Sequence, residues 1–373
     1  MAGIYLHIPF CKQACHYCDF HFSTSLKYKE DLLQALVKEL HIQKDYLQGQ
    51  TIETIYFGGG TPSILPPADI NLLLDTITQL HTVAENAEIT LEANPDDLDK
   101  ARIQGLRQTL VNRFSIGIQS FFDEDLLWMN RVHRAHEAEA SVKRAQDAGF
   151  ENITIDLIYG YPLLTDAKWK HNLDKAFELE VPHVSSYSMT VEPQTALASF
   201  IRQHKQPAMN EQQSAEQFSY LMQAMQTRGF EHYEISNFCK PGHYSRHNSN
   251  YWRGVSYLGI GPSAHSYNGE VRQWNIANNP KYIQSIFTDQ LPAEIEELTE
   301  TNRLNEYIMT SLRTSWGLDL EALNNIAAGA ATELTKTATP YFDKGWITQN
   351  QNIITLTPTG KLYADHIAAE LFF

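Results

Sequence analysis

Three of the four cysteines in this chain lie close together and have the spacing of ligands to an iron–sulfur cluster. Cys11, Cys15 and Cys18 form the pattern C-x-x-x-C-x-x-C directly after the apolar run at residues 4–8. Three thiolates from one loop can hold three corners of a 4Fe–4S cluster, which normally takes four protein ligands. One iron would then stay open to a small molecule, so the loop predicts a cluster that can bind a ligand.

The same cysteines could instead hold zinc, with a histidine completing a Cys3His site. Zinc sites usually combine two ligand pairs that lie far apart in the chain, and no second C-x-x-C pair is present here. The spacing therefore favours the cluster. The zinc alternative depends on a fourth ligand from His7, His16 or His21.

Composition indicates a globular protein that is too long for one ordinary core. With 373 residues, we expect two domains or a barrel with an appendage. The formal net charge of −15 argues against non-specific binding to nucleic acid or to an anionic membrane. No apolar run approaches the length of a membrane span and no signal peptide is evident, so we expect a cytoplasmic protein, with peripheral membrane association left open.

Short apolar runs alternate with amphipathic stretches over the first two-thirds of the chain. Repeated β–α units of this kind make a parallel sheet, so we predict an α/β fold with a partial (β/α)6-type barrel, and a doubly wound open sheet as the alternative. The predicted strands are residues 3–9, 52–57, 87–92, 112–118, 151–158, 182–187 and 231–235. The predicted helices are residues 28–47, 66–80, 97–108, 135–148, 166–180 and 210–229.

The pattern changes near residue 240, which suggests three regions. We predict a barrel domain over 1–240, a linking segment over 241–290 and a C-terminal domain over 291–373. Residues 240–280 are rich in Gly, Asn, Tyr and Trp and are expected to be irregular. Helices at 298–315, 319–326 and 330–343, then a hairpin near 346–356 and a last helix at 358–371, indicate a mainly helical, winged-helix-like domain. This region has few basic residues, so we expect docking or lid function rather than DNA binding.

Polar or glycine residues stand at or near the ends of successive predicted strands. Residues 58–61 read Gly-Gly-Gly-Thr, and Glu92, Gln119 and Asp156 end or lie within the next strands. In a parallel barrel the carboxyl ends of the strands share one rim, which is where ligands gather. The cysteine loop follows the first strand and would lie on the same rim.

Six ordered motifs over residues 4 to about 270 resemble the radical S-adenosylmethionine (SAM) enzymes. The motifs are Y-x-H-I-P-F-C-x-x-x-C-x-Y-C, Y-F-G-G-G-T-P-S, L-E-A-N-P, G-I-Q-S, N-R and D-L-I-Y-G-Y-P. The subgroup they resemble contains the oxygen-independent coproporphyrinogen III oxidases and their relatives. The resemblance implies a 4Fe–4S cluster on Cys11, Cys15 and Cys18, with SAM on the open iron. It further implies SAM-binding roles for Tyr5, Tyr17, Gly59, Gly60, Thr61, Glu92, Gln119, Arg131 and Asp156.

The chain departs from the oxidases in ways that favour a heme-carrying relative. The oxidases have a further cysteine two residues after the third, where this chain has Phe20, and they carry a long segment before the cluster that we do not expect here. Residues 247–252 spell H-N-x-x-Y-W, which is similar to a segment associated with heme binding in the heme chaperone branch. That resemblance implies His247 as an axial heme ligand, with Tyr251 and Trp252 packing on the macrocycle. The alternative is a histidine hydrogen-bonded within a loop beside two core aromatics.

Two functions remain open on this reading. The resemblance implies a heme chaperone that binds heme, a 4Fe–4S cluster and SAM and passes heme to an acceptor protein. The alternative is an oxidase that decarboxylates coproporphyrinogen III to protoporphyrinogen IX through a 5′-deoxyadenosyl radical. Either function implies an electron donor for the cluster and no nucleic-acid partner.

Overall fold

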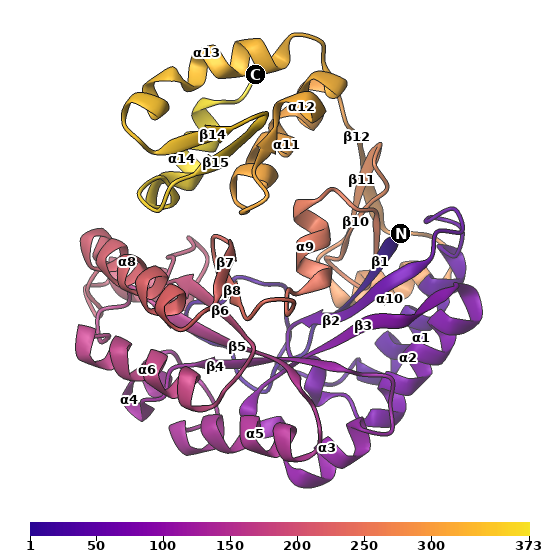
Figure 1. The fold of residues 1–373 in the computed structure, drawn as a ribbon. Coiled ribbons are helices and arrows are strands. Elements are labelled where there is room, and N and C mark those ends of the chain that lie inside the picture. Colours follow the sequence, from indigo (N-terminus) through magenta and orange to yellow (C-terminus); the bar gives the residue numbers. More distant parts are fainter.

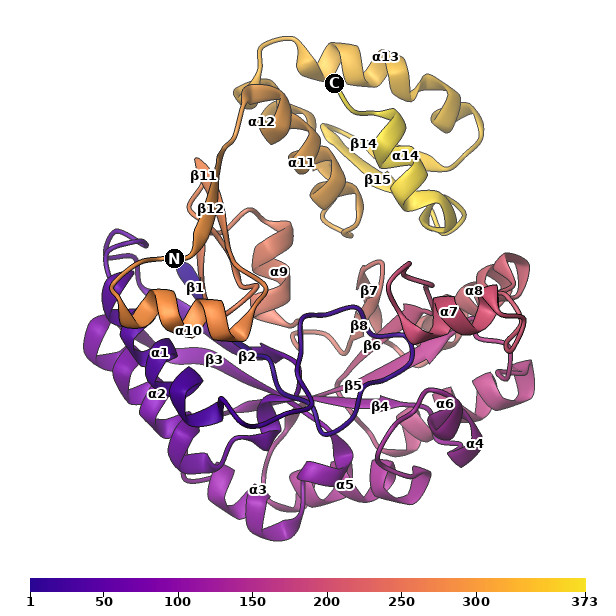
Figure 2. The ribbon, with the colours of Figure 1, turned by 180° about the vertical axis from the view of Figure 1, so that it is seen from behind.

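Six parallel strands form the wall of an open half barrel, with their connecting helices on its outer side (Figures 1 and 2). The structure is a computed structural model that describes residues 1–373. The strands are β1 Ala2–Ile8, β2 Ile52–Gly59, β3 Val83–Ala93, β4 Arg113–Gln119, β5 Asn152–Tyr159 and β6 His183–Ser188. The helices between them are α1 Lys29–Ile42, α2 Pro67–Leu80, α3 Lys100–Leu106, α4 Asp123–Trp128, α5 Ala135–Asp147 and α6 Asp166–Glu178.

The alternation of side chains along each strand explains why this sheet curves around a polar interior. Successive residues of a strand point to opposite faces. In β1, Ile4, Leu6 and Ile8 are buried in the apolar core, whereas Tyr5 and His7 take the other face. The other strands repeat this pattern, and the apolar faces of the helices cover the outer side of the sheet. We call the concave, polar side of the sheet the lumen.

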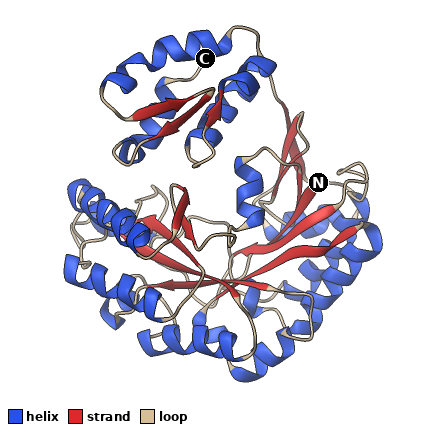
Figure 3. Ribbon diagram, viewed as in Figure 1, coloured by secondary structure: helices blue, strands red, loops and turns tan.

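The predicted fold class is confirmed, with a sheet that does not close. Each predicted strand and helix of the first two-thirds overlaps an observed element, including α8 Glu211–Thr227 and β7 Glu231–Glu234. The sequence pattern missed the short helices α4 and α7 Ala196–Arg202. The doubly wound alternative is wrong, because the connecting helices lie on one face of the sheet (Figure 3).

Residues 240–280 are more regular than expected, and that expectation is wrong. They form helix α9 Arg246–Trp252 and strands β9 Tyr257–Ile260, β10 His265–Tyr267 and β11 Val271–Asn275. Strand β9 pairs in parallel with β1, and β10, β11 and β12 Ala293–Glu297 extend that edge in antiparallel fashion. A Cβ at Gly259 would lie 2.0 Å from the carbonyl oxygen of His265. This glycine therefore permits close approach of two strands and does not mark a loop.

The two ends of the main sheet carry further elements that complete the half barrel. Helix α10 Asn279–Phe287 packs Tyr282, Ile283 and Ile286 into the main core. At the opposite edge, β8 Asn237–Cys239 pairs antiparallel with both β6 and β7. Segment 241–290 therefore packs on the barrel, and the three domain boundaries stay a prediction.

The C-terminal region has its own apolar core and the predicted order of helices followed by a hairpin. It contains α11 Glu300–Leu312, β13 Leu318–Asp319, α12 Leu320–Ile326, α13 Ala330–Asp343, β14 Ile347–Asn350, β15 Ile353–Leu356 and α14 Ala364–Glu370. Leu304, Ile308, Leu334, Ile354 and Ile367 lie in this second core. Nowhere in the chain does a helix combine the length and the apolar character that crossing a bilayer requires.

Candidate functional site

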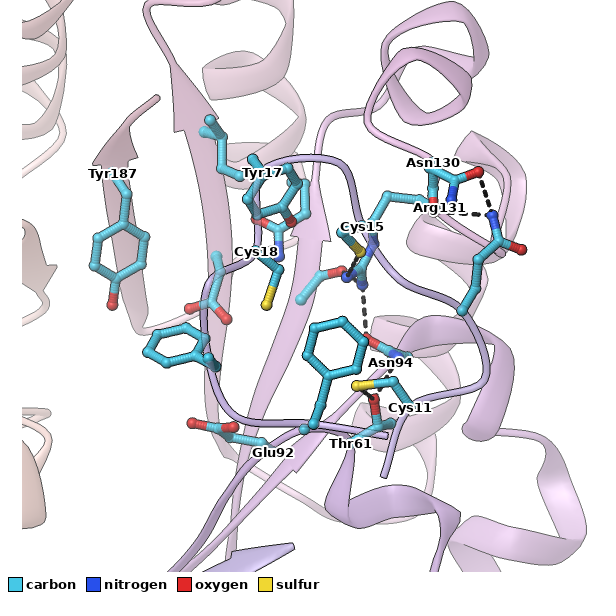
Figure 4. A pocket seen from close by; sticks show the side chains of 18 of the residues that line it. Cys11, Cys15, Tyr17, Cys18, Thr61, Glu92, Asn94, Asn130, Arg131 and Tyr187 are labelled. Carbon is cyan, nitrogen blue, oxygen red and sulfur yellow. Dashed lines mark hydrogen bonds between the residues drawn. The ribbon is translucent and has the colours of Figure 1, made fainter. Parts of the chain in front are cut away.

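A cavity of about 420 Å³ lies at the carboxyl ends of the parallel strands, beneath the cysteine loop (Figure 4). All but one of the residues predicted for the cluster and SAM line this single cavity: Cys11, Cys15, Tyr17, Cys18, Gly59, Gly60, Thr61, Glu92, Gln119, Arg131 and Asp156. They come from the cysteine loop, from the ends of β2 to β5 and from the turn after α4. The exception is Tyr5, which lies deeper in the lumen.

The cysteine loop is held on two sides by hydrogen bonds to backbone carbonyls, one of which is donated by the side chain of Asn130. Within the loop, the Cys11 N–H donates to the Ser23 carbonyl over 3.0 Å. On the other side, the Asn130 amide donates to the Ala14 carbonyl over 2.7 Å, and the His16 N–H donates to the Met129 carbonyl over 3.1 Å. The loop is therefore anchored to the segment that carries Arg131, which orients the thiols before any metal arrives.

Two of the three sulfurs accept hydrogen bonds from polar side chains in the cavity. Thr61 Oγ1 donates to Cys11 Sγ over 3.5 Å, and Arg131 Nη1 donates to Cys15 Sγ over 3.6 Å. Burial raises the pKa of the Cys18 thiol to about 12. Burial thus disfavours the free thiolate, and binding of this sulfur to a metal would stabilise its deprotonated form.

The zinc alternative finds no support in the geometry. No three His, Cys, Asp or Glu side chains gather around a point that could hold a single metal ion. The histidines proposed as a fourth ligand bond elsewhere: His7 Nε2 to the His21 carbonyl, His16 Nδ1 to the Trp128 carbonyl and His21 Nε2 to Asn279 Oδ1. The three thiols line one shared cavity, which is where a cluster would be held.

Arg131 is the best-supported candidate for binding the carboxylate of a small ligand. Its Nη2 donates to Asn94 Oδ1 over 2.6 Å and to the Gly117 carbonyl over 2.8 Å. Its Nε is buried and has no partner. Arg131 lines the cavity, and its guanidinium carries the positive charge that an anionic ligand oxygen requires.

The glycine run brings strand β2 against the cysteine loop. A Cβ on Gly60 would lie 2.7 Å from the Phe10 carbonyl oxygen, and a Cβ on Gly59, where φ is +103°, would lie 2.6 Å from the His7 ring. The Gly60 N–H already donates to the Ile8 carbonyl over 2.9 Å. This N–H is therefore not free to bind a ligand carboxylate, and the run acts through close approach.

Two carboxyl groups of the cavity have raised pKa values. Burial raises the pKa of Glu92 to about 7, and the nearby Asp156 raises it as well. Burial also raises the pKa of Asp156 to about 6. Tyr56 donates to Glu92 Oε1 over 2.8 Å, and Ser115 donates to Asp156 Oδ1 over 3.5 Å. Both groups accept hydrogen bonds best when ionised, which suits ribose hydroxyls or an amine.

These raised pKa values predict that SAM binding weakens in acid. Glu92 and Asp156 become neutral as the pH falls through about 7 and about 6, which removes two acceptors and the negative charge opposite a cationic ligand. We expect the Kd for SAM to rise about tenfold or more from pH 8 to pH 5.5, since each tenfold step is worth about 1.4 kcal/mol. Equilibrium dialysis across this range measures the effect. Glu92→Gln should remove the change in the Kd near pH 7, where Glu92 titrates. A wild-type Kd that does not change with pH would contradict the prediction.

The H-N-x-x-Y-W segment lies deep in the lumen, on helix α9. His247 is 2% exposed, and both of its ring nitrogens are paired, Nδ1 with Thr54 Oγ1 and Nε2 with the Tyr251 hydroxyl, each at 2.8 Å. Burial lowers the pKa of His247 to about 3, so the ring is neutral. The Trp252 ring lies 5.3 Å from the Arg313 guanidinium of the C-terminal region, and its indole N–H is buried and unpaired. His247 is thus hydrogen-bonded on a helix and not within a loop, Tyr251 and Trp252 are only partly buried, and the heme-binding role of the motif stays a prediction.

Sequence reasoning missed several residues that line the cavity. Asn94 links Arg131 to Thr61 through its amide, which donates to Thr61 Oγ1 over 3.1 Å. Tyr187, at the end of β6, borders the cavity and is 43% exposed. Asn94 lies inside the L-E-A-N-P motif, and Tyr187 ends a predicted strand, so the argument from strand ends could have found both.

Family models match two parts of the chain. The model for the radical SAM superfamily matches residues 5–176, which include the cysteine loop and the strand ends up to β5. The model for the HemN C-terminal domain matches residues 298–363. Membership in the radical SAM superfamily implies a 4Fe–4S cluster and SAM, which the donor set of the cavity fits.

Relatives and a solved structure extend this similarity over the whole chain. The chain is 34% identical to the heme chaperone HemW of Bacillus subtilis, covering 98% of both chains, and 32% identical to HemW of Escherichia coli, covering 99% of this chain and 97% of the relative. Its fold resembles that of the coproporphyrinogen III oxidase HemN of Escherichia coli, with a TM-score of 0.85 and 23% identity over 100% of this chain and 90% of the oxidase. The chain belongs to the HemW family of the radical SAM superfamily.

Proposed function

We propose that this protein is a heme chaperone that binds heme and transfers it to an acceptor protein. The observation that carries the proposal is the end-to-end similarity to relatives named as heme chaperones in several bacteria. Phe20 supports it, because an exposed phenylalanine stands where the oxidases have a further cysteine. Its ring is 68% exposed beside the cavity and cannot serve as a ligand or a proton donor.

In the proposed site, Cys11, Cys15 and Cys18 hold the cluster. Arg131 would supply positive charge for an anionic oxygen of SAM, and Glu92 and Asp156 would accept hydrogen bonds from hydroxyl or amine groups of this ligand. Cluster and SAM supply one-electron chemistry when bound, and the chain supplies position and charge. Tyr17, Gly59, Gly60, Thr61 and Gln119 shape the walls of the cavity. Tyr5 supports the cavity from below and does not line it.

Heme binding through His247 requires helix α9 to change its contacts. Nε2 is paired with the Tyr251 hydroxyl, so iron at that nitrogen would require the hydroxyl to move away. The ring is neutral, which is the form that ligates heme iron. We propose that the Tyr251 hydroxyl occupies Nε2 of His247 in the heme-free protein. Tyr251 and Trp252 would then pack on the macrocycle when heme binds.

Hemin titration of the purified full-length protein tests this function. We expect a Soret shift on binding, and His247→Ala should weaken hemin binding about tenfold or more, which corresponds to about 1.4 kcal/mol. His41→Ala, which removes an exposed histidine from α1, is the matched control and should leave binding unchanged. No Soret shift with the wild type would exclude the chaperone function. An unchanged affinity in His247→Ala would exclude this ligand.

The second candidate function is the oxidase reaction, which the shared fold with HemN favours. An anaerobic assay with reductant, SAM and coproporphyrinogen III on the same reconstituted sample decides between the two. Vinyl product above the blank would support the oxidase. The acceptor protein and the electron donor stay proposals that the chaperone function implies.

A further inference from the structure

Tyr56 connects helix α9 to the cavity through the lumen. Its ring stacks on the ring of His247, with centroids 5.0 Å apart and planes inclined by 27°. Its hydroxyl donates to Glu92 Oε1 over 2.8 Å. Tyr56 is 7% exposed, so a single buried side chain touches both the motif histidine and a carboxyl group of the cavity.

His247 is itself held on several sides, so its position is well defined. Thr54 and Tyr251 pair with its ring nitrogens, as described above. Its backbone N–H donates to Glu88 Oε1 over 3.0 Å, and the neighbouring Arg246 N–H donates to Glu88 Oε2 over 3.0 Å. The carboxylate therefore caps the start of α9 and fixes the height of the histidine in the lumen.

A parallel branch runs from the same histidine to the cysteine loop. The Tyr5 ring stacks on Tyr56 at 6.1 Å and on His247 at 6.4 Å. The Tyr5 hydroxyl lies 3.2 Å from His7 Nδ1, and His7 Nε2 lies 2.9 Å from the His21 carbonyl in the cysteine loop. A shift of the His247 ring would thus be transmitted to Glu92 and to the cysteine loop through these stacked rings and hydrogen bonds.

We propose that Tyr56 is a positioning residue that couples helix α9 to Glu92, so that heme bound at His247 and SAM bound in the cavity weaken each other. This inference rests on the proposed function and adds an energetic link between its two ligands. His247 could ligate heme iron only after a ring nitrogen leaves its hydrogen-bond partner, and the imidazole against which Tyr56 stacks would then shift. Glu92 then loses the donor that holds it toward the cavity. Thermodynamic linkage requires the weakening to be equal in both directions.

The test uses the reconstituted full-length protein and measures the Kd for SAM by equilibrium dialysis, with and without hemin. We expect hemin to raise the wild-type Kd about fivefold, within the usual range of coupling between sites. Tyr56→Phe keeps the ring that stacks on His247 and removes only the donor to Glu92. It should raise the Kd for SAM about fivefold without hemin and abolish the further effect of hemin, since a hydrogen bond to a charged group is lost.

The matched control is Tyr159→Phe, which removes the hydroxyl of a buried tyrosine that packs against Phe218 and Trp169, away from the lumen. It should keep both the wild-type Kd and the effect of hemin. The coupling is refuted if both ligands bind the wild type independently, or if Tyr56→Phe still responds to hemin. A wild type that binds no hemin refutes the chaperone function instead, and the hemin-free comparison of Tyr56→Phe with Tyr159→Phe then decides whether Tyr56 positions Glu92.

Discussion

Replacing any one of Cys11, Cys15 and Cys18 with alanine is expected to abolish cluster binding. Each thiolate is one of only three protein ligands that the loop offers, and Cys239, the remaining cysteine, is fully buried in β8 on the far edge of the sheet. No other cysteine can therefore replace the missing cluster ligand. We expect bound iron and labile sulfide to fall about a hundredfold or more. Loss of even a hydrogen-bond partner of a metal ligand typically lowers metal affinity about 10–100-fold, and here a ligand itself is removed.

Metal and sulfide analysis after anaerobic reconstitution measures this effect, together with the electron paramagnetic resonance signal of the reduced protein. Cys239→Ala is the matched control and should keep the full cluster content, since its thiol packs inside the sheet. Unfolding midpoints of the four variants separate loss of ligand from loss of fold. Retention of a complete cluster in any of the three loop variants would contradict the assignment.

Glu88→Ala is expected to cause the largest loss of stability. Glu88 is 4% exposed and lies with its Oε2 3.8 Å from Nε of Arg113, which is 1% exposed. It also accepts the first backbone N–H groups of α9. Its removal deprives a buried guanidinium of its ion-pair partner, so we expect a loss of about 3–5 kcal/mol in the free energy of unfolding.

Urea unfolding followed by circular dichroism tests this expectation, with Glu85→Ala as the control because that carboxylate is exposed on the same strand. The double variant Glu88→Ala, Arg113→Met removes the unpaired charge and should regain part of the loss. Such a double-mutant cycle separates the ion pair from the cap of α9. Equal midpoints for Glu88→Ala and Glu85→Ala would show that the buried pair does not stabilise the fold.

The local pattern of the sequence was sufficient to predict the fold class and most of the predicted residues that line the cavity. Strand and helix periodicity depends on neighbours in the chain, so the six parallel strands and their helices could be predicted. Parallel strands place their carboxyl ends on one rim, so the sequence predicts that Glu92, Asp156 and the cysteine loop lie together, as they do in the cavity.

Other features depend on contacts between segments that are far apart in the chain. The sequence could not show that Gly259 lets β10 approach β9, because that clash involves a second strand. Nor could it show that the Gly60 N–H is already paired with the Ile8 carbonyl. Glycine in a sequence indicates freedom of the backbone, and only packing shows how that freedom is used.

The cysteine spacing, the motifs at the strand ends and Phe20 were enough by themselves to place this chain among radical SAM proteins and beside the heme chaperones. Only the tertiary structure decided that Tyr5 lies below the cavity and that His247 is buried, neutral and paired with Thr54, which is 193 residues away in the chain. Periodicity and spacing report local geometry, whereas the burial and partners of a side chain are set by which distant segments fold against it.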